Sequence, residues 1–438
     1  MRLPRYPEYK DSGVEWLGEI PCHWSVCRLQ DIAQVINGYP FDSKLFCEEG
    51  GHPLIRIRDL DAEETATRYA GDFVPAAAVE TGDVLIGMDG EFNVGRWLGS
   101  EQALLNQRMC CVRPSRPALA TFLRHALPAP LKSINDVTYS TTVKHLSSFQ
   151  VKSIRLALPD DAELEQISRF LDRETGKIDA LIAEQEKLLA LLAEKRQATI
   201  SHAVTRGLDP NAPMKDSGIP WLGPVPVHWE IARLKFVAMV QTGIAKGKDT
   251  SGKDTITVPY LRVANVQDGH LALDHIATIE IEPEQLDRYR LRPGDVLMNE
   301  GGDFDKLGRG ALWNGEIENC IHQNHVFAVR PRGISPQWLN QITGSSYAQF
   351  FFMGRSKQST NLASISSTNV MELPVLLPPH VEQVEILDFI QDESARIDAL
   401  RAAGRQAVGL LQERRSALIA AAVTGQIDVR GAVEMEAA

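Results

Sequence analysis

The segment 247–254 has the glycine and lysine spacing of a phosphate-binding loop, which would make it a nucleotide site. Its last position is Asp254, where the motif needs a Ser or Thr hydroxyl to hold magnesium. A carboxylate there would face phosphate, and the residues that follow, 256–258, are typical of a strand, whereas the motif leads into a helix. The segment is therefore not predicted to bind a nucleotide.

Two further segments resemble catalytic motifs but lack their key residues. The two prolines in 377–380 lie between a leucine and a histidine, where an amino-methyltransferase motif needs a polar residue before them and an aromatic residue after them. Pro159 and Asp160 could open a nuclease motif, but a helical heptad follows in place of a strand. We therefore expect no catalytic residue and no metal or cofactor site in this chain, so it is predicted not to be an enzyme.

The remaining chemistry is that of reading DNA. Glycine-flanked segments in both halves of the chain carry amide, guanidinium, ammonium and hydroxyl groups, which pair with base edges and phosphates. The predicted DNA contacts are those residues that differ between the halves or lie on loops: Lys44, Arg96, Gln107, Arg108, Tyr139, Lys144, Lys246, Lys248, Lys306, Arg309, Gln323, Asn324, Lys357 and Gln358. For each of them, solvated surface is the alternative interpretation.

The two halves of the chain are copies of one unit. The segment 10–24 returns as 215–229, with both copies ending in a histidine and a tryptophan, and 177–181 returns as 396–400. The displacement is 205 positions for the first pair and 219 for the second, so insertions lie in the interior of each unit. Constant edges around altered interiors suggest one scaffold that carries two different recognition surfaces.

Residues that recur identically are poor candidates for reading two different sequences. A structural or subunit-docking role is therefore favoured for Trp16, Trp24, Trp221 and Trp229, and for His23 and His228. Arg56 and Arg262 also recur, and for them a phosphate contact or a structural ion pair is favoured over base reading.

A long helix is predicted from about 162 to 206, where the sequence has no proline and a single glycine. A heptad seam runs through Leu164, Leu171, Ile178, Gln185 and Leu192, and Ile167, Leu181 and Leu188 are predicted to complete it. A second long helix is predicted after Pro378 and Pro379, with a seam through Ile386, Ile390, Ile397, Leu400, Leu411 and Leu418. Gly404 and Gly409 weaken it by about 1 kcal/mol each, so it needs a packing partner. The first helix, in antiparallel orientation, is the predicted partner.

Composition sets the class of protein. The chain has 438 residues, 44% of them hydrophobic, and between the helices short β-rich runs alternate with Gly, Pro and Asp, as in mixed α/β domains. No apolar run is long enough to span a membrane and no secretory leader is visible, so a cytoplasmic protein is expected. The six cysteines do not recur between the copies and are predicted to be free thiols. A net charge of −11 argues against wholesale coating of nucleic acid but permits local basic loops.

Together these features resemble the specificity subunit of type I restriction-modification enzymes over nearly the whole chain. The resemblance is carried by the repeated openings 10–24 and 215–229, the Ser-Thr pairs at 140–141 and 359–360, and the helix ends at 203–207 and 422–425. It implies an α/β (α+β) fold with two similar target recognition domains, separated by two long helices that form an antiparallel coiled coil. The implied bounds are 1–158 and 208–377 for the domains, 159–207 and 378–425 for the spacer helices, and 426–438 for a C-terminal tail.

The resemblance also implies the partners. These are double-stranded DNA, two methyltransferase (modification) subunits and restriction (translocase and nuclease) subunits, with no membrane involved. S-adenosylmethionine, ATP and Mg are expected on the partner subunits and not on this chain. The alternative is a two-domain coiled-coil scaffold that binds proteins and has no sequence-specific DNA binding.

Overall fold

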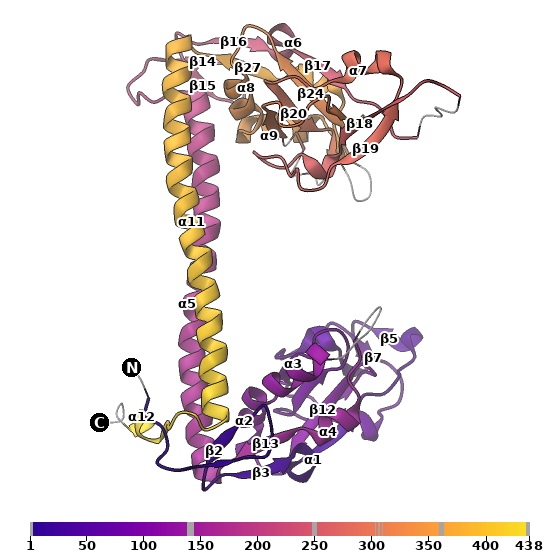
Figure 1. Ribbon diagram of the computed structural model, residues 1–438, viewed down its shortest axis with the longest axis vertical. Helices are drawn as coiled ribbons and strands as arrows, with labels where there is room; N and C mark the ends of the chain where they lie inside the picture. Colours follow the sequence, from indigo (N-terminus) through magenta and orange to yellow (C-terminus); the bar gives the residue numbers. More distant parts are fainter. Residues whose placement is uncertain are drawn as a thin grey trace. The chain divides into compact units, whose positions relative to one another are not determined.

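The computed structural model describes residues 3–137, 144–247, 252–302, 304, 307–308, 310–358 and 363–434. The chain forms two compact units. The first unit consists of Met1–Glu186 and Gln406–Ala438, and the second consists of Lys187–Arg405. Each unit contains a mixed α/β domain and a part of each of two long helices, α5 and α11 (Figure 1).

The first unit is built around an antiparallel sheet in the order β10-β9-β12-β4. Its strands are β4 (Ala33–Asn37), β9 (Val84–Gly87), β10 (Val94–Arg96) and β12 (Met109–Pro114). Side chains alternate between the two faces of a strand. Val84 and Ile86 therefore enter one core while Leu85, between them, enters another. Because both faces are covered, every residue of β9 is buried.

A second sheet packs on one of these faces, in the order β5-β7-β6-β11-β8. Its strands are β5 (Phe46–Cys47), β6 (His52–Ile55), β7 (Arg68–Tyr69), β8 (Ala78–Val79) and β11 (Ala103–Leu105). β6 and β11 run parallel. Ile55 and Leu105 from this sheet share a buried cluster with Leu85 and Trp97, which joins the two sheets.

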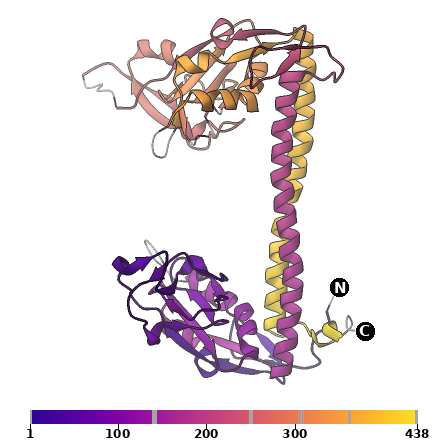
Figure 2. The ribbon, with the colours of Figure 1, turned by 180° about the vertical axis from the view of Figure 1, so that it is seen from behind.

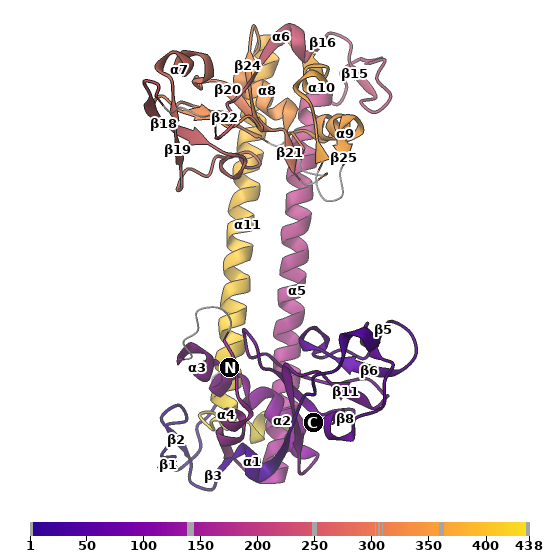
Figure 3. The same cartoon turned by 90° about the vertical axis from the view of Figure 1, so that its right-hand side faces the viewer.

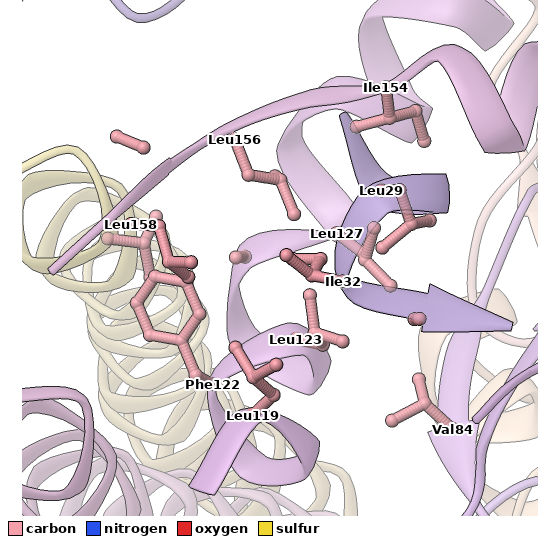
Figure 4. Packing of buried hydrophobic residues seen from close by; sticks show 14 of the residues in the cluster. Leu29, Ile32, Val84, Leu119, Phe122, Leu123, Leu127, Ile154, Leu156 and Leu158 are labelled. Carbon is pink, nitrogen blue, oxygen red and sulfur yellow. The ribbon is translucent and has the colours of Figure 1, made fainter. Parts of the chain in front are cut away.

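Helices cover the other face of the first sheet. The spacing of Leu119, Phe122, Leu123 and Leu127 places one apolar stripe toward the core, and Figure 4 shows this stripe directed at Ile32 and Leu156. The elements that surround this core are α1 (Leu29–Ile32), α2 (Ala118–Ala126), α3 (Pro128–Val137), α4 (Ser148–Ser153), β1 (Tyr9–Asp11), β2 (Glu19–Pro21), β3 (Ser25–Arg28) and β13 (Arg155–Leu158), with the short 3₁₀ turns η1 (Ser43–Leu45), η2 (Ile57–Asp59) and η3 (Pro75–Ala77).

The second unit repeats this plan (Figure 3). Its main sheet has the order β17-β24-β20-β22, and a parallel pair, β18 with β23, matches β6 with β11. The repeated elements are β14 (Met214–Asp216), β15 (Pro224–Pro226), β16 (Glu230–Arg233), α6 (Leu234–Val237), β17 (Ala238–Thr242), β18 (Ile256–Leu261), η4 (Val263–Asn265), β20 (Asp295–Asn299), β22 (Gly310–Trp313), β23 (Ile321–His322), β24 (Val326–Pro331), α8 (Pro336–Thr343), α9 (Ser346–Arg355), α10 (Ser367–Met371) and β27 (Pro374–Leu377). The internal repeat predicted from the sequence is therefore confirmed in the fold.

The copies differ where the sequence offset changes. The second unit has β19 (Ala277–Ile281) and α7 (Pro283–Tyr289) beside β18, and a small sheet of β21 (Gly301–Gly302), β26 (Ala363–Ser364) and β25 (Lys357–Gln358). The scaffold is therefore kept while the segments at its edges are altered.

The two long helices are α5 (Asp161–Arg206, 46 residues) and α11 (His380–Val423, 44 residues). In the first unit the start of α5 shares a core with the end of α11. In the second unit the end of α5 shares a core with the start of α11. The helices are thus antiparallel in each unit, and none of the described helices is long and apolar enough to cross a membrane.

Burial corrects part of the predicted seam. Leu164, Leu171, Ile178 and Leu192 are buried as predicted, as are Ile167, Ile386, Ile390 and Ile397, and Leu411 and Leu418 are partly buried. Leu181, Leu188 and Leu400, however, are 53%, 45% and 58% exposed, so their assignment to the seam is wrong. The companion positions lie one residue later, at Thr175, Ile182 and Leu189, because the partner helix follows the i, i+4 row of α5. Thr175 is tolerated there because its hydroxyl donates to the Leu171 carbonyl at 2.7 Å.

The two ends of the chain meet in the first unit, as the views in Figures 1 and 2 agree. The backbone N–H of Asp428 donates to the Pro4 carbonyl at 2.8 Å, and Val429 is fully buried in the domain core. The segment after α11, including α12 (Arg430–Glu434), therefore packs as part of this unit as far as residue 432.

Candidate nucleic-acid interface

In the first unit, the loop 106–108 between β11 and β12 carries two of the predicted DNA contacts. A β-carbon on Gly38 would lie 1.9 Å from the Asn106 carbonyl oxygen, so only glycine permits this close approach. A backbone bridge joins Tyr39 to Asn106, and the Asn106 side chain accepts a hydrogen bond from the backbone N–H of Gln107 at 2.8 Å. The loop backbone is held on both sides while Gln107 and Arg108 are exposed.

Asp89 lies between two basic side chains at this loop. Its carboxylate is 3.4 Å from Nε of Arg108 and 2.7 Å from Nδ1 of His145. The Arg108 side chain remains 57% exposed, so the carboxylate restrains the guanidinium without covering it. Asp89 and His145 also form a backbone bridge, which fixes the pair just beyond the end of β9.

Lys144 is adjacent to this cluster but points inward. Its ammonium donates to the backbone oxygen of Asn135 at 2.6 Å and to the side-chain oxygen of the same residue at 3.0 Å. The Asn135 amide in turn donates to the Gly90 carbonyl at 2.6 Å. Lys144 therefore joins α3 to the loop after β9, which gives it a structural role in this arrangement.

The second unit has the same loop with different side chains. A β-carbon on Gly243 would lie 2.0 Å from the His322 carbonyl oxygen, and a backbone bridge joins Ile244 to Gln323. His325 then follows, with its Nδ1 held 2.7 Å from Oε2 of Glu300. The Asn324 amide nitrogen lies 3.3 Å from Nε2 of His325. Here too an exposed ring is held by a single carboxylate.

A recess of about 450 Å³ lies beside this pair. Its walls are Val263, Glu300, His325, the backbone of Gly301 and Gly302, and Ala363 with Ser364. Strand β25 pairs with β26 at its edge, placing Lys357 opposite Ser364 and Gln358 opposite Ala363. The predicted contacts Lys357 and Gln358 therefore lie one strand away from Gly301 and Gly302, on the other side of β26.

Hydrogen bonds establish which positions of the two loops correspond. The N–H of Met88 donates to the Arg108 carbonyl at 2.9 Å, and the N–H of Glu300 donates to the His325 carbonyl at the same distance. The next hydrogen bonds also match: the backbone N–H of Leu146 donates to the Met88 carbonyl, and the backbone N–H of Ile365 donates to the Glu300 carbonyl. Position by position, Asn106, Gln107 and Arg108 therefore correspond to Gln323, Asn324 and His325.

The other predicted contacts fall into three groups. Lys44, in η1, and Lys246, in a turn after β17, are exposed in their respective units. Arg96 is half-buried: it donates to the Thr121 hydroxyl at 3.3 Å and its Nε has no hydrogen-bond partner within the described part of the chain, so it packs on α2. Four residues lie outside the described ranges: Tyr139, Lys248, Lys306 and Arg309.

Four members of these clusters are not among the predicted contacts: Asp89, His145, Glu300 and His325. The two carboxylates do not fit the sequence pattern of a DNA contact, because a carboxylate repels phosphate and its role here depends on the basic side chain that it holds. The available signal was position, since Asp89 and Glu300 each directly precede a glycine at the end of a buried strand. His322, by contrast, is fully buried, so its ring is not available to a ligand at the surface. Burial lowers its pKa, and its Nδ1 lies 2.7 Å from the Val326 carbonyl oxygen.

The repeated histidine and tryptophan pair is structural, as predicted for Trp24 and Trp229. Both indoles are fully buried and cannot stack on bases. Trp24 donates to Glu163 at 3.1 Å and lies beside Gly425. Trp229 lies beside Gly207, whose built β-carbon would be 3.4 Å from its ring. Each indole therefore packs against the end of a long helix.

The remaining sequence expectations concern ion pairs, thiols and metals. Among the described residues no ion pair is formed by Arg56 or Arg262, so the structural ion-pair interpretation is not supported for them. All six cysteines are free, and burial raises the pKa of Cys110 to about 12, as expected of an unreactive core thiol. No group of three metal-binding side chains occurs within the described ranges.

Comparison with known proteins shows which protein family this chain resembles. A domain described as the type I restriction modification DNA specificity domain matches residues 21–190. The chain is 29% identical over 437 residues to the type I restriction enzyme EcoBI specificity subunit of Escherichia coli, covering 98% of this chain and 91% of that one. Residues 21–190 therefore match a type I specificity domain, and the whole chain is similar to type I restriction enzyme specificity subunits.

Other specificity subunits are similar to this chain over nearly its whole length. The EcoKI specificity subunit of Escherichia coli strain K12 is 22% identical, with 95% of this chain and 92% of that one covered. The fold is shared with a chain from a structure concerning complex assembly and conformational transition of the type I R-M system, at a TM-score of 0.63 and 19% identity. That match covers 92% of this chain and 98% of the other. This similarity to specificity subunits supports a non-catalytic DNA-recognition role for the chain.

Proposed function

We propose that this chain selects the DNA sites of a type I restriction-modification complex, with each mixed α/β domain reading one half of a bipartite, asymmetric site. The observation that carries the proposal is the correspondence between loops 106–108 and 323–325. The same backbone position, held by the same close glycine approach, presents Arg108 in one unit and His325 in the other. One scaffold with two different polar edges suits two different short sequences.

The proposed recognition domains are 1–158 and 208–377, and the proposed spacers are 159–207 and 378–425, followed by the segment 426–438. DNA affinity would arise from the exposed basic and amide side chains on the loops, because the overall charge of −11 is unfavourable. Proposed contacts are the exposed Lys44, Gln107, Arg108, Lys246, Lys357 and Gln358, together with Gln323 and Asn324. Tyr139, Lys248, Lys306 and Arg309 remain proposals from the sequence.

The long helices are proposed to set the gap between the half-sites and to dock two methyltransferase subunits. A helix of 46 residues extends roughly 70 Å at 1.5 Å per residue. Apolar side chains outside the seam support docking, since Leu181, Leu188 and Leu191 are each about half exposed on α5. Restriction subunits complete the proposed complex, which acts in the cytoplasm. S-adenosylmethionine, ATP and Mg would be bound by the partner subunits.

The test is to map adenine methylation in genomic DNA by single-molecule sequencing. Cells carry the modification subunit with this chain or without it. The expected result is a split motif with a fixed gap that disappears when the chain is absent. An active modification subunit that yields no motif attributable to the chain would contradict the proposal and would favour a protein-binding scaffold.

A further inference from the structure

The two units contain one pair of corresponding carboxylate contacts that has the features of a structural ion pair. Asp83 and Arg113 of the first unit are 2.7 Å apart, and Asp295 and Arg330 of the second unit are also 2.7 Å apart. Both carboxylates are buried, and both pairs join the same two strands of the main sheet. An ion pair that supports the scaffold is therefore kept identical in the two copies.

The contacts at the loops have the opposite character. Arg108 and His325 occupy corresponding positions, but their residue types differ and their side chains are 57% and 56% exposed. Their carboxylate partners also differ in place, since Glu300 corresponds to Met88 and Asp89 lies one residue further along the chain. An exposed pair of this kind contributes little to stability. At this backbone position the side chain differs between the units, and its ion pair contributes little to stability. This is the pattern expected where the two units must recognise different ligands.

The Arg108 guanidinium is suited to one base edge. Asp89 contacts it through Nε at 3.4 Å, and the Nη1 of Arg108 lies 3.5 Å from Nδ1 of His145. His145 holds the other oxygen of Asp89 at 2.7 Å, which limits rotation of the carboxylate. A guanidinium fixed in this way can direct two parallel N–H donors outward, and guanine is the base that presents two acceptors, O6 and N7, in the major groove.

His325 offers a different group at the corresponding position. Glu300 accepts from Nδ1, so Nε2 is the nitrogen that faces Asn324 and the solvent. A single ring nitrogen beside an amide cannot form the two parallel donor contacts of a guanidinium fork. The recess formed by Gly301, Gly302 and Ser364 leaves space next to the ring for the edge of a base.

We propose that Arg108 and His325 are the corresponding specificity-determining residues of the two units, with Arg108, positioned by Asp89, selecting a guanine in one half-site. This inference rests on the proposed function. His325, positioned by Glu300, determines a base in the other half-site. Asp89, His145 and Glu300 are positioning residues, because they act through the basic side chains and not on the base.

The experiment compares the full-length chain, in complex with its modification subunit, as wild type, Arg108→Ala, Arg108→Lys, Asp89→Asn and His325→Ala. Arg116→Ala is the matched control, because Arg116 is also an exposed arginine paired with a carboxylate, Asp161, on the first unit. Each complex binds a set of duplexes in which every position of the mapped site carries each of the four bases. The readout is the ratio of affinities among the four bases at each position.

Wild type and Arg116→Ala are expected to prefer guanine at one position of one half-site. Arg108→Ala should reduce that preference by roughly 5- to 150-fold at this position only, the range expected for one bidentate contact. Arg108→Lys and Asp89→Asn should weaken it partly, and His325→Ala should relax a position in the other half-site.

The ratio of affinities among the four bases distinguishes loss of base selectivity from a general loss of DNA binding. A uniform loss of affinity at all positions in Arg108→Ala, or an unchanged preference in that variant, would overturn the inference while the proposed function stands. A wild-type complex that shows no split site would overturn the proposed function itself.

Discussion

The indole nitrogen of Trp24 lies 3.1 Å from Oε2 of Glu163, a carboxylate on the first turn of α5. The same side chain accepts from the Tyr6 hydroxyl at 2.5 Å and lies 2.9 Å from Nε2 of His23. Burial, and then the bond to Glu163, raises the pKa of Tyr6, so the hydroxyl remains a donor. In the second unit Glu382, on the first turn of α11, lies 2.7 Å from His228. The repeated motif thus fastens each domain to the start of a helix.

Replacing Glu163 should destabilise the first unit. Glu163→Ala leaves the Tyr6 hydroxyl and the Trp24 indole buried without an acceptor, and each such group costs about 1–3 kcal/mol. The free energy of unfolding, measured by urea titration of the full-length chain, should fall by at least that amount. Glu165→Ala, two residues away and exposed, is the control and should change it by less than about 0.5 kcal/mol. Equal effects of the two substitutions would refute the fastening role.

The corrected seam can be tested on two neighbouring leucines. Leu192 is 8% exposed and Leu191 is 51% exposed on the same turn of α5. Leu192→Ala should lower the free energy of unfolding by about 2–5 kcal/mol, because it creates a cavity between the helices. Leu191→Ala should have little effect on the isolated chain. If Leu191→Ala were the more damaging substitution, the assignment of the seam would be reversed.

Stability should fall as the pH is lowered from 7 toward 5. Burial lowers the pKa of His322 below its usual value of 6.5, and burial also lowers that of His125, despite its contact with Asp172 at 2.9 Å. Below about pH 6.5 the unfolded chain therefore binds more protons than the folded chain does. Lowering the pH favours unfolding for this reason. His322→Asn retains an N–H donor for the Val326 carbonyl but cannot titrate. The variant should show a shallower dependence of unfolding free energy on pH, and an unchanged slope would exclude His322 as a contributor.

Exchange of 230–377 for the corresponding segment of another family member should change one half-site only. The reason is that the second unit has its own core, formed by residues such as Trp229, Val296 and Trp338. Methylation mapping of the hybrid should show the other half-site and the gap unaltered. A change in both half-sites would mean that the two domains do not read DNA independently.

Lengthening both long helices by one turn should change only the gap. One turn adds about 5.4 Å along a helix axis. The insertion must be made in α5 and α11 together, since Asp179 of the first unit contacts Arg415 at 2.7 Å and Arg196 of the second unit contacts Asp398 at 3.7 Å. The half-sites read from methylation mapping should stay the same. If the gap between the half-sites stayed the same, the long helices would not set its length.

The amino-acid sequence was sufficient to predict the repeat, the mixed α/β domains and the two long helices. Each of these is determined by local patterns, such as the heptad from Leu164 to Leu192 and the apolar run 84–86. Such patterns persist in any arrangement of the chain, because propensity and periodicity depend on neighbours a few residues apart. The structural role of Trp24 and Trp229 was also predictable, since identical residues are unsuited to reading different sequences.

Tertiary structure decided which side chains act together. Asp89, Arg108 and His145 are separated by 19 and 37 positions in the sequence, and only the pairing of β9 with β12 and the bridge at residues 89 and 145 bring them into contact. Leu181 and Leu188 are apolar and fit the heptad spacing, but they are exposed. The direction of the partner helix determines which row of α5 side chains is buried. Both outcomes depend on contacts between distant segments, and a distance along the chain carries no information about such contacts until the fold brings the segments together.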